Sequence, residues 1–160
     1  MTTKADFTTD EWQSIVQAPM AIGGLVTLAS PAIGDAMKES MSVAKKIAEL
    51  AQNTGNEELL GALAEEFKSR ATAKEAQLKL ETRDPAAVKA QMLGVVQSAA
   101  AAIDAKAAPE EATKAKQWLY SLGEAAANAA KEGDFMGIGG QRVSPEEEAV
   151  LGEIKTALRI

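Results

Sequence analysis

The chain has 160 residues, which is enough for one domain with its own hydrophobic core. Apolar residues make up 46% and charged residues 25%, close to the average of globular proteins, which excludes a disordered or fibrous chain. The sequence contains neither cysteine nor histidine, so disulfides, thiolate metal sites and the common histidine-based catalytic triads are excluded. A formal charge of -6 opposes binding to phosphate backbones, and we therefore expect no nucleic acid partner.

The first expected helix begins at a capping box. Thr8 is followed three residues later by Glu11, and Phe7 is placed to pack on Trp12 as a hydrophobic staple. Pro19 disfavours helical geometry for the residue before it. The sequence therefore predicts a helix that bends near this proline.

We expect this bent N-terminal helical segment to occupy residues 7–34. The stretch 12–34 carries no charge and approaches the length of a membrane span, but prolines, glycines and polar side chains interrupt it. It is interpreted as a buried core segment, with Gly23-Gly24 at a close helix contact, and we expect no membrane partner. Acidic residues ahead of it are the wrong charge for a secretory signal, so we expect a cytoplasmic protein.

Two further helices are expected before residue 81. The first follows a cap at Ser30-Pro31, ends at the turn 53–55 and carries a broad apolar stripe. The residues of the stripe recur at alternating spacings of four and three: Met37, Met41, Ala44, Ala48 and Ala51. Beside them lie the apolar residues Val43, Ile47 and Leu50. The second is capped by Asn56 and should reach about Leu80. Its expected inner face consists of Leu60, Leu63, Ala64, Phe67, Ala71 and Leu78.

Three more helices open with a proline at the first helical position, after Asp84, at Pro109 and after Ser144. The apolar stripe of the helix after Asp84 consists of Val88, Met92, Val95, Val96, Ala99 and Ile103. The inward residues of the helix that starts at Pro109 are Ala115, Trp118, Leu119, Leu122, Ala125, Ala126 and Ala129. The last helix has the apolar residues Val150, Leu151, Ile154 and Leu158.

These elements predict an all-α fold, namely an antiparallel helical bundle of about four long helices with a bent N-terminal helix and a short C-terminal helix. We expect a single helical domain over residues 1–160. Within it, the four-helix core occupies residues 35–132, a Gly-rich loop residues 133–143, and the C-terminal helix residues 144–160.

We assign no catalytic residue, no cofactor and no metal. Di-metal bundle sites use a Glu-x-x-His motif, and this chain has no histidine. Five glutamates lie among polar residues and are expected to be exposed: Glu65, Glu66, Glu110, Glu111 and Glu124. Lys116, Tyr120 and Glu124 share a helix surface at four-residue spacing, which is more typical of a salt-bridge ladder than of a proton relay.

The Gly-rich loop 133–143 is the sharpest local motif. Glycines ahead of a helix N-terminus are able to bind an anion, with Arg142 to help. However, the loop lacks the ending of a phosphate-binding P-loop, follows no strand and precedes three glutamates that would repel phosphate. It is interpreted as a connector that docks Phe135, Met136 and Ile138 on the bundle. If these side chains are exposed instead, they form an apolar hook for a partner or a second copy.

The leading functional hypothesis is a non-catalytic interaction module that self-associates or binds a protein partner. The alternative is a bundle that binds a small apolar ligand between its second and fourth long stripes. The lining of that pocket would consist of Met41, Phe67, Met92 and Trp118. A third hypothesis, an enzyme that uses carboxylates or Tyr120, needs several such groups in one cleft.

Overall fold

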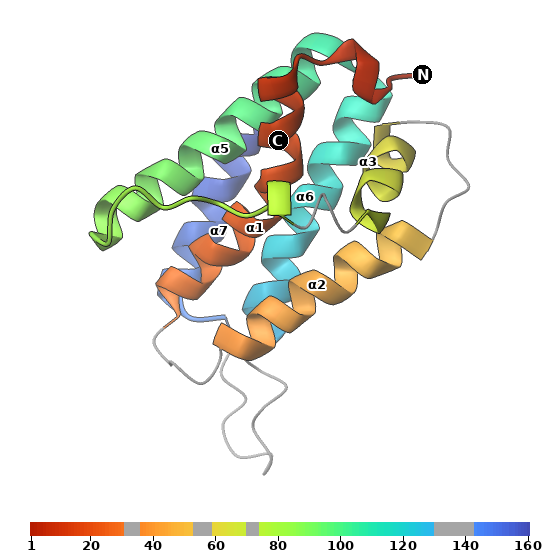
Figure 1. Ribbon diagram of the computed structural model, residues 1–160. Helices are drawn as coiled ribbons and strands as arrows, with labels where there is room; N and C mark the ends of the chain where they lie inside the picture. Colours follow the sequence, from red (N-terminus) through yellow and green to blue (C-terminus); the bar gives the residue numbers. More distant parts are fainter. Residues whose placement is uncertain (31–35, 53–58, 70–73, 130–142) are drawn as a thin grey trace.

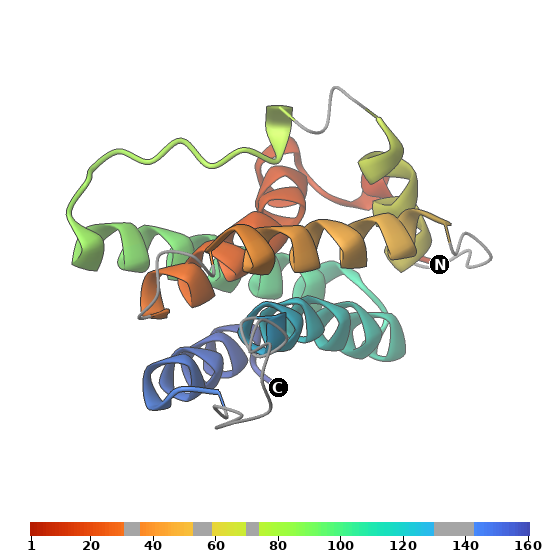
Figure 2. The same ribbon diagram turned by 90° about the horizontal axis from the view of Figure 1, so that it is seen from below.

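The computed structural model describes residues 1–30, 36–52, 59–69, 74–129 and 143–160. In this part of the chain α-helices pack into a bundle and no strand is present (Figure 1 and Figure 2). The helices are α1 (Thr9–Ala29), α2 (Ala36–Gln52), α3 (Leu59–Lys68), α5 (Pro85–Lys106), α6 (Pro109–Ala129) and α7 (Pro145–Leu158), preceded by the short 3-10 helix η1 (Lys4–Asp6). The predicted all-α class and helical bundle are confirmed.

Local sequence sets the start of several helices. At the start of α1, the Thr8 hydroxyl accepts a hydrogen bond from the N–H of Glu11 at 3.3 Å, and the Glu11 carboxylate accepts one from the N–H of Thr8 at 2.7 Å. Asp84 caps α5 by accepting a hydrogen bond from the N–H of Ala87 at 2.9 Å, and Ser144 with Glu147 forms a capping box at the start of α7. These caps stand where the sequence predicts them, because they depend only on residues three positions apart.

The first long helix, α1, lies at the centre of the bundle. It packs against α2, α5, α6 and α7, and its axis changes direction about half way along, where it contains Pro19 (Figure 1). Its buried residues are Trp12, Ile15, Val16, Ala18, Pro19, Ala21, Ile22, Leu25 and Val26. The expectation of a buried core segment is thus confirmed for α1, which contacts four other helices and lies inside the bundle.

Two glycines of α1 allow its neighbours to approach closely. A Cβ atom added at Gly23 would lie 3.2 Å from Cγ2 of Val43 on α2. One added at Gly24 would lie 2.7 Å from Cε of Met92 on α5. The close helix contact predicted for this pair is confirmed, and it involves two different helices.

The helix expected to reach Leu80 ends at Lys68, so that prediction was wrong. Residues 74–84, called the strap below, run largely extended across α1 and α5 (Figure 1). The Gln17 amide donates to two strap carbonyls at 3.2 and 3.4 Å. The Gln91 amide donates to a third carbonyl at 2.8 Å and accepts from a strap N–H at 3.3 Å. Because side chains of α1 and α5 form hydrogen bonds with its backbone, the strap is stable in extended form.

Among the described helices, α5 is the one long and apolar enough to cross a bilayer by length and composition. The core helix of a soluble protein passes the same test. α5 packs along α1 and directs one side of its surface into the core. Its buried residues are Val88, Met92, Val96, Ala99, Ala100, Ala102 and Ile103. We therefore interpret α5 as a core helix.

Candidate functional site

Helix α2 packs on the bundle with only one of its two apolar sides. On that inner side Val43 is buried against Gly23 of α1, and Ile47 and Leu50 are partly buried against the same core. The hydroxyl of Ser42 donates to a carbonyl of α6 at 3.0 Å, which fixes the rotation of α2 about its axis. The remaining apolar residues of α2 therefore point away from the core.

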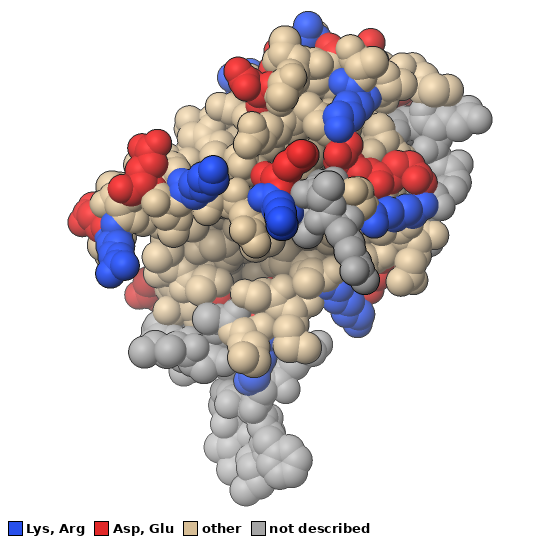
Figure 3. Space-filling view, in the orientation of Figure 1, with Lys and Arg blue, Asp and Glu red and all other residues tan. Residues whose placement is uncertain are grey.

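Those residues form the α2 outer face, which we define as Met37, Met41, Ala44 and Ala48. The two methionines are 74% and 67% exposed, and both alanines are exposed as well. The surface over the N-terminal half of α2 contains few charged side chains (Figure 3). The apolar stripe predicted for α2 thus includes residues of both its inner side and its outer face. The outward part of it, the α2 outer face, is exposed.

The neighbouring helix α1 adds apolar surface of its own. Met20 is 48% exposed and Leu28 45% exposed, on a helix whose other residues are largely buried. Exposed apolar surface bordered by polar residues is characteristic of sites where proteins associate. Methionine is enriched at such interfaces because its flexible side chain adapts to different partners.

The inner side of α2 also contains a buried carboxyl group, Glu39. Its side chain is fully buried, and one oxygen, Oε2, accepts a hydrogen bond from the hydroxyl of Thr27 on α1 at 2.8 Å. Among the described residues the other oxygen, Oε1, has no hydrogen-bond partner. A buried carboxyl group with incomplete hydrogen bonding lowers stability. The contact between α1 and α2 is therefore weaker than its apolar residues alone suggest.

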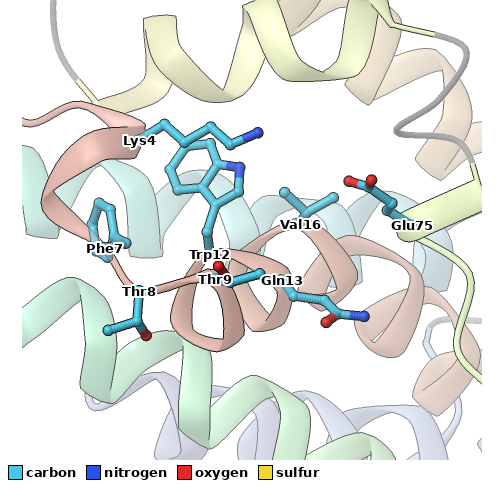
Figure 4. A pocket seen from close by; sticks show the side chains of 8 residues that line it. All are labelled: Lys4, Phe7, Thr8, Thr9, Trp12, Gln13, Val16 and Glu75. Carbon is cyan, nitrogen blue, oxygen red and sulfur yellow. The ribbon is translucent and has the colours of Figure 1, made fainter.

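A cleft of about 560 Å³ lies between η1, the first half of α1 and the strap (Figure 4). The ring of Phe7 lies 5.5 Å from that of Trp12, which confirms the predicted hydrophobic staple. Lys4 extends over the indole, with its Nζ atom 6.0 Å from the ring centre, and Glu75 of the strap lies at the far end of the cleft. The cleft is thus lined by aromatic rings with a charged group at each end.

Two polar groups of this cleft, those of Lys4 and Trp12, are already bonded within the chain. Nζ of Lys4 forms an ion pair with Glu66 of α3 at 3.0 Å, and the indole N–H of Trp12 donates to the same carboxylate at 3.2 Å. A second cleft, of about 670 Å³, lies between the strap and α5. It is lined by Gln17 and Gln91, whose amides hold the strap. A ligand that uses these polar groups would have to compete with the bonds they already make.

The four residues predicted to line a ligand pocket do not meet in one place. The rings of Phe67 and Trp118 lie 6.2 Å apart, where α3 packs on α6. Met92 is buried against Gly24 of α1, and Met41 belongs to the α2 outer face. None of the four lines either cleft described above. Ligand binding by this chain stays a prediction.

Glu111 was expected to be exposed and is buried instead. Its Oε2 atom accepts a hydrogen bond from the N–H of Thr2 at 3.0 Å, and Oε1 lies 3.4 Å from the N-terminal amine of Met1. Hydrogen bonds from Thr2, together with the nearby amine, lower the pKa of Glu111 against the opposing effect of its burial. Unlike Glu39, this buried carboxylate is fully bonded.

Lys116, Tyr120 and Glu124, which were predicted to form a salt-bridge ladder along one helix, are arranged differently. Lys116 is buried, and its Nζ atom donates to Asp104 of α5 at 2.7 Å. Burial and the charge of Glu124 raise the pKa of Tyr120, so the phenol keeps its proton at neutral pH. In the described part of the chain no three acidic side chains gather as metal ligands. The arrangement is that of ion pairs that join helices.

The predicted interaction residues Phe135, Met136, Ile138 and Arg142 lie outside the described residues. The α2 outer face was not assigned an interaction role from the sequence. The sequence signals this face only through the spacing of its four residues, which follow one another at intervals of four, three and four. Val43 and Leu50 do not belong to this series.

Comparison with known proteins adds no family to this description. No family model, no curated protein and no solved structure matches the chain.

Proposed function

We propose that this protein acts by association with a protein partner and that the α2 outer face is its docking surface. The observation that carries the proposal is the exposure of Met37 and Met41 on a helix whose opposite side is already packed. A monomer buries only one side of an amphipathic helix. An apolar stripe on the other side gains free energy only when a partner removes it from water.

The chemistry of the surface favours a protein partner over other classes. The chain carries a net charge of -6, which opposes association with nucleic acid. No catalytic role is proposed. The buried groups Glu111 and Lys116 are bonded to other groups of the chain, and the buried Glu39 lines neither cleft. We place this activity in the cytoplasm, in keeping with the expectation from the sequence.

Native mass spectrometry of the chain purified gently from its own source tests this proposal. The wild-type protein should carry a second polypeptide, of any sequence. A variant with Met37→Lys and Met41→Lys should have lost it. The matched control is Leu80→Lys, which places a charge at another exposed apolar position and should keep the partner. A wild-type spectrum that contains only single chains even at the highest protein concentration contradicts the proposal.

Small-molecule binding remains the second candidate, with the two clefts beside the strap as its location. The same spectra separate the two functions. A small added mass that the double lysine variant keeps, without a second polypeptide, favours the ligand-binding bundle. Loss of a whole polypeptide in that variant favours association through α2.

A further inference from the structure

The α2 outer face has the spacing of a coiled-coil seam. Met37, Met41, Ala44 and Ala48 follow one another at intervals of four, three and four residues, and all four are exposed. This is the heptad spacing with which a helix presents a stripe to a second helix that winds around it. The 17 residues of α2 span about 25 Å, so the seam covers about two heptads. The surface therefore fits a helix as its occupant.

The size of the side chains changes along the seam in one direction. Both methionines lie in the N-terminal half of α2, Ala44 lies at its middle and Ala48 in its C-terminal half. A parallel copy would place large residues on large ones and small on small. An antiparallel copy would place Met41 opposite Ala48 of the second copy, so that each long side chain fills the space beside a short one. The seam is thus complementary to itself under a two-fold rotation.

The charges beside the seam agree with this orientation. Helical periodicity places Lys38, Lys45 and Glu49 on one flank, while Ser40 and Ile47 lie on the other. In an antiparallel pair like flanks meet, so Lys38 comes beside Glu49 of the second copy, twice in each dimer. The two copies of Lys45 meet once, near the two-fold axis, so two contacts between opposite charges stand against one between like charges. In a parallel pair the charged flank would meet Ser40 and Ile47, which carry no charge. Charge complementarity therefore favours the antiparallel pair.

From these observations we infer that the partner of the α2 outer face is a second copy of this chain. The two α2 helices pack antiparallel, with the two-fold axis beside Ala44. This inference rests on the proposed function and deepens it by naming the partner. One helix pair is a small interface, at the low end of the range of specific complexes, so the dimer forms at high protein concentration and dissociates on dilution.

Cysteine cross-linking tests the geometry, since the chain has no cysteine of its own. Helix axes about 8 Å apart bring the two copies of residue 44 within reach of a disulfide. The Ala44→Cys variant should form a covalent dimer under mild oxidation with diamide. Residues 48 of the two copies would be offset by about 12 Å along the axis, so Ala48→Cys should stay monomeric. Bridging of both variants would indicate a parallel pair and overturn the inference.

A size exchange provides a second test that does not depend on oxidation. In sedimentation equilibrium, Met41→Ala should raise the dissociation constant of the dimer about 10-fold or more, because each dimer loses the side chain twice. Adding Ala48→Met should restore the affinity, since the large and small partners merely exchange places. A double variant as weak as the single one contradicts the antiparallel pairing.

The outcomes also separate this inference from the proposed function. If the wild-type chain stays monomeric at the highest concentration and neither cysteine variant bridges, the second copy is not the partner. The proposed function still holds in that case if the native complex contains a different polypeptide that the double lysine variant loses. If no polypeptide is found at all, both are wrong.

Discussion

Helices α1 and α2 have comparable lengths, 21 and 17 residues, yet the bundle holds them in different ways. α1 is surrounded by other helices, and most of its apolar side chains are buried. α2 buries Val43 and the carboxyl group of Glu39, while its methionines face water. A helix whose apolar residues are all used by the core contributes stability. A helix with apolar residues left over contributes a surface for association.

The largest expected effect lies in α1. Leu25→Ala removes a fully buried side chain and should lower the free energy of unfolding by about 2–5 kcal/mol, because it leaves a cavity that the bundle cannot fill. Urea denaturation measures the loss. The control is Leu28→Ala on the same helix, which is 45% exposed and should cost less than about 1 kcal/mol. Equal losses would contradict the assignment of α1 as the central helix.

The next effect concerns Glu111, a buried glutamate with a partner at each carboxylate oxygen. Glu111→Gln weakens charge-assisted hydrogen bonds from the Thr2 region and should lower the free energy of unfolding by about 1–3 kcal/mol at pH 7. Its exposed neighbour offers a matched variant, Glu110→Gln, which should change stability by less than about 0.5 kcal/mol. Thermal or urea unfolding of both variants checks this difference.

The same glutamate predicts a pH dependence. Its pKa is lower in the folded chain than the ordinary value of 4.5, so the unfolded chain binds the proton more readily. The stabilisation is fully present above pH 4.5 and is lost as the pH falls through the folded value. The difference in stability between wild type and Glu111→Gln should therefore shrink below pH 4.5. A difference that grows on acidification would show that the sign is wrong.

Glu39 should respond in the opposite direction. Glu39→Gln keeps an acceptor for the hydroxyl of Thr27 and removes the cost of a buried carboxyl group that lacks a full set of bonds. We expect a gain of about 1–2 kcal/mol in the free energy of unfolding at pH 7. Glu49→Gln, an exposed position on the same helix, serves as the control and should leave stability nearly unchanged. A loss of stability in Glu39→Gln would mean that this carboxylate is well compensated.

The smallest expected effect is that of the outward methionines on the monomer. Met41→Ala should change the free energy of unfolding by less than about 0.5 kcal/mol in dilute solution, because the side chain is already in water. On the inner side of the same helix, Val43→Ala should cost about 2 kcal/mol. If both substitutions cost the same, the two sides of α2 do not differ as described.

The sequence predicted those parts of the fold that depend on neighbours along the chain. The capping boxes at Thr8 and Ser144 and the staple of Phe7 on Trp12 form as expected. The extended strap was not predicted, because nothing within it breaks a helix. The amides of Gln17 and Gln91, distant in sequence, hold its backbone.

The candidate site was only partly visible in the sequence. The stripe that contains Met37 and Met41 was recognised, but periodicity cannot tell which of two apolar sides of a helix meets the core. That choice depends on tertiary contacts, such as the fit of Val43 against Gly23. The burial of Glu111 was missed for the same reason, since its donor, Thr2, lies 109 residues away.

Hydrogen exchange measured by mass spectrometry at low and high protein concentration tests the central claim most directly. If the α2 outer face binds a second copy, amides of residues 36–52 exchange more slowly at high concentration, while those of α1 keep the same rate. In the Met37→Lys, Met41→Lys variant the dependence on concentration should disappear. Unchanged exchange of α2 at every concentration, or slower exchange confined to another helix, would contradict the association of two copies through this face.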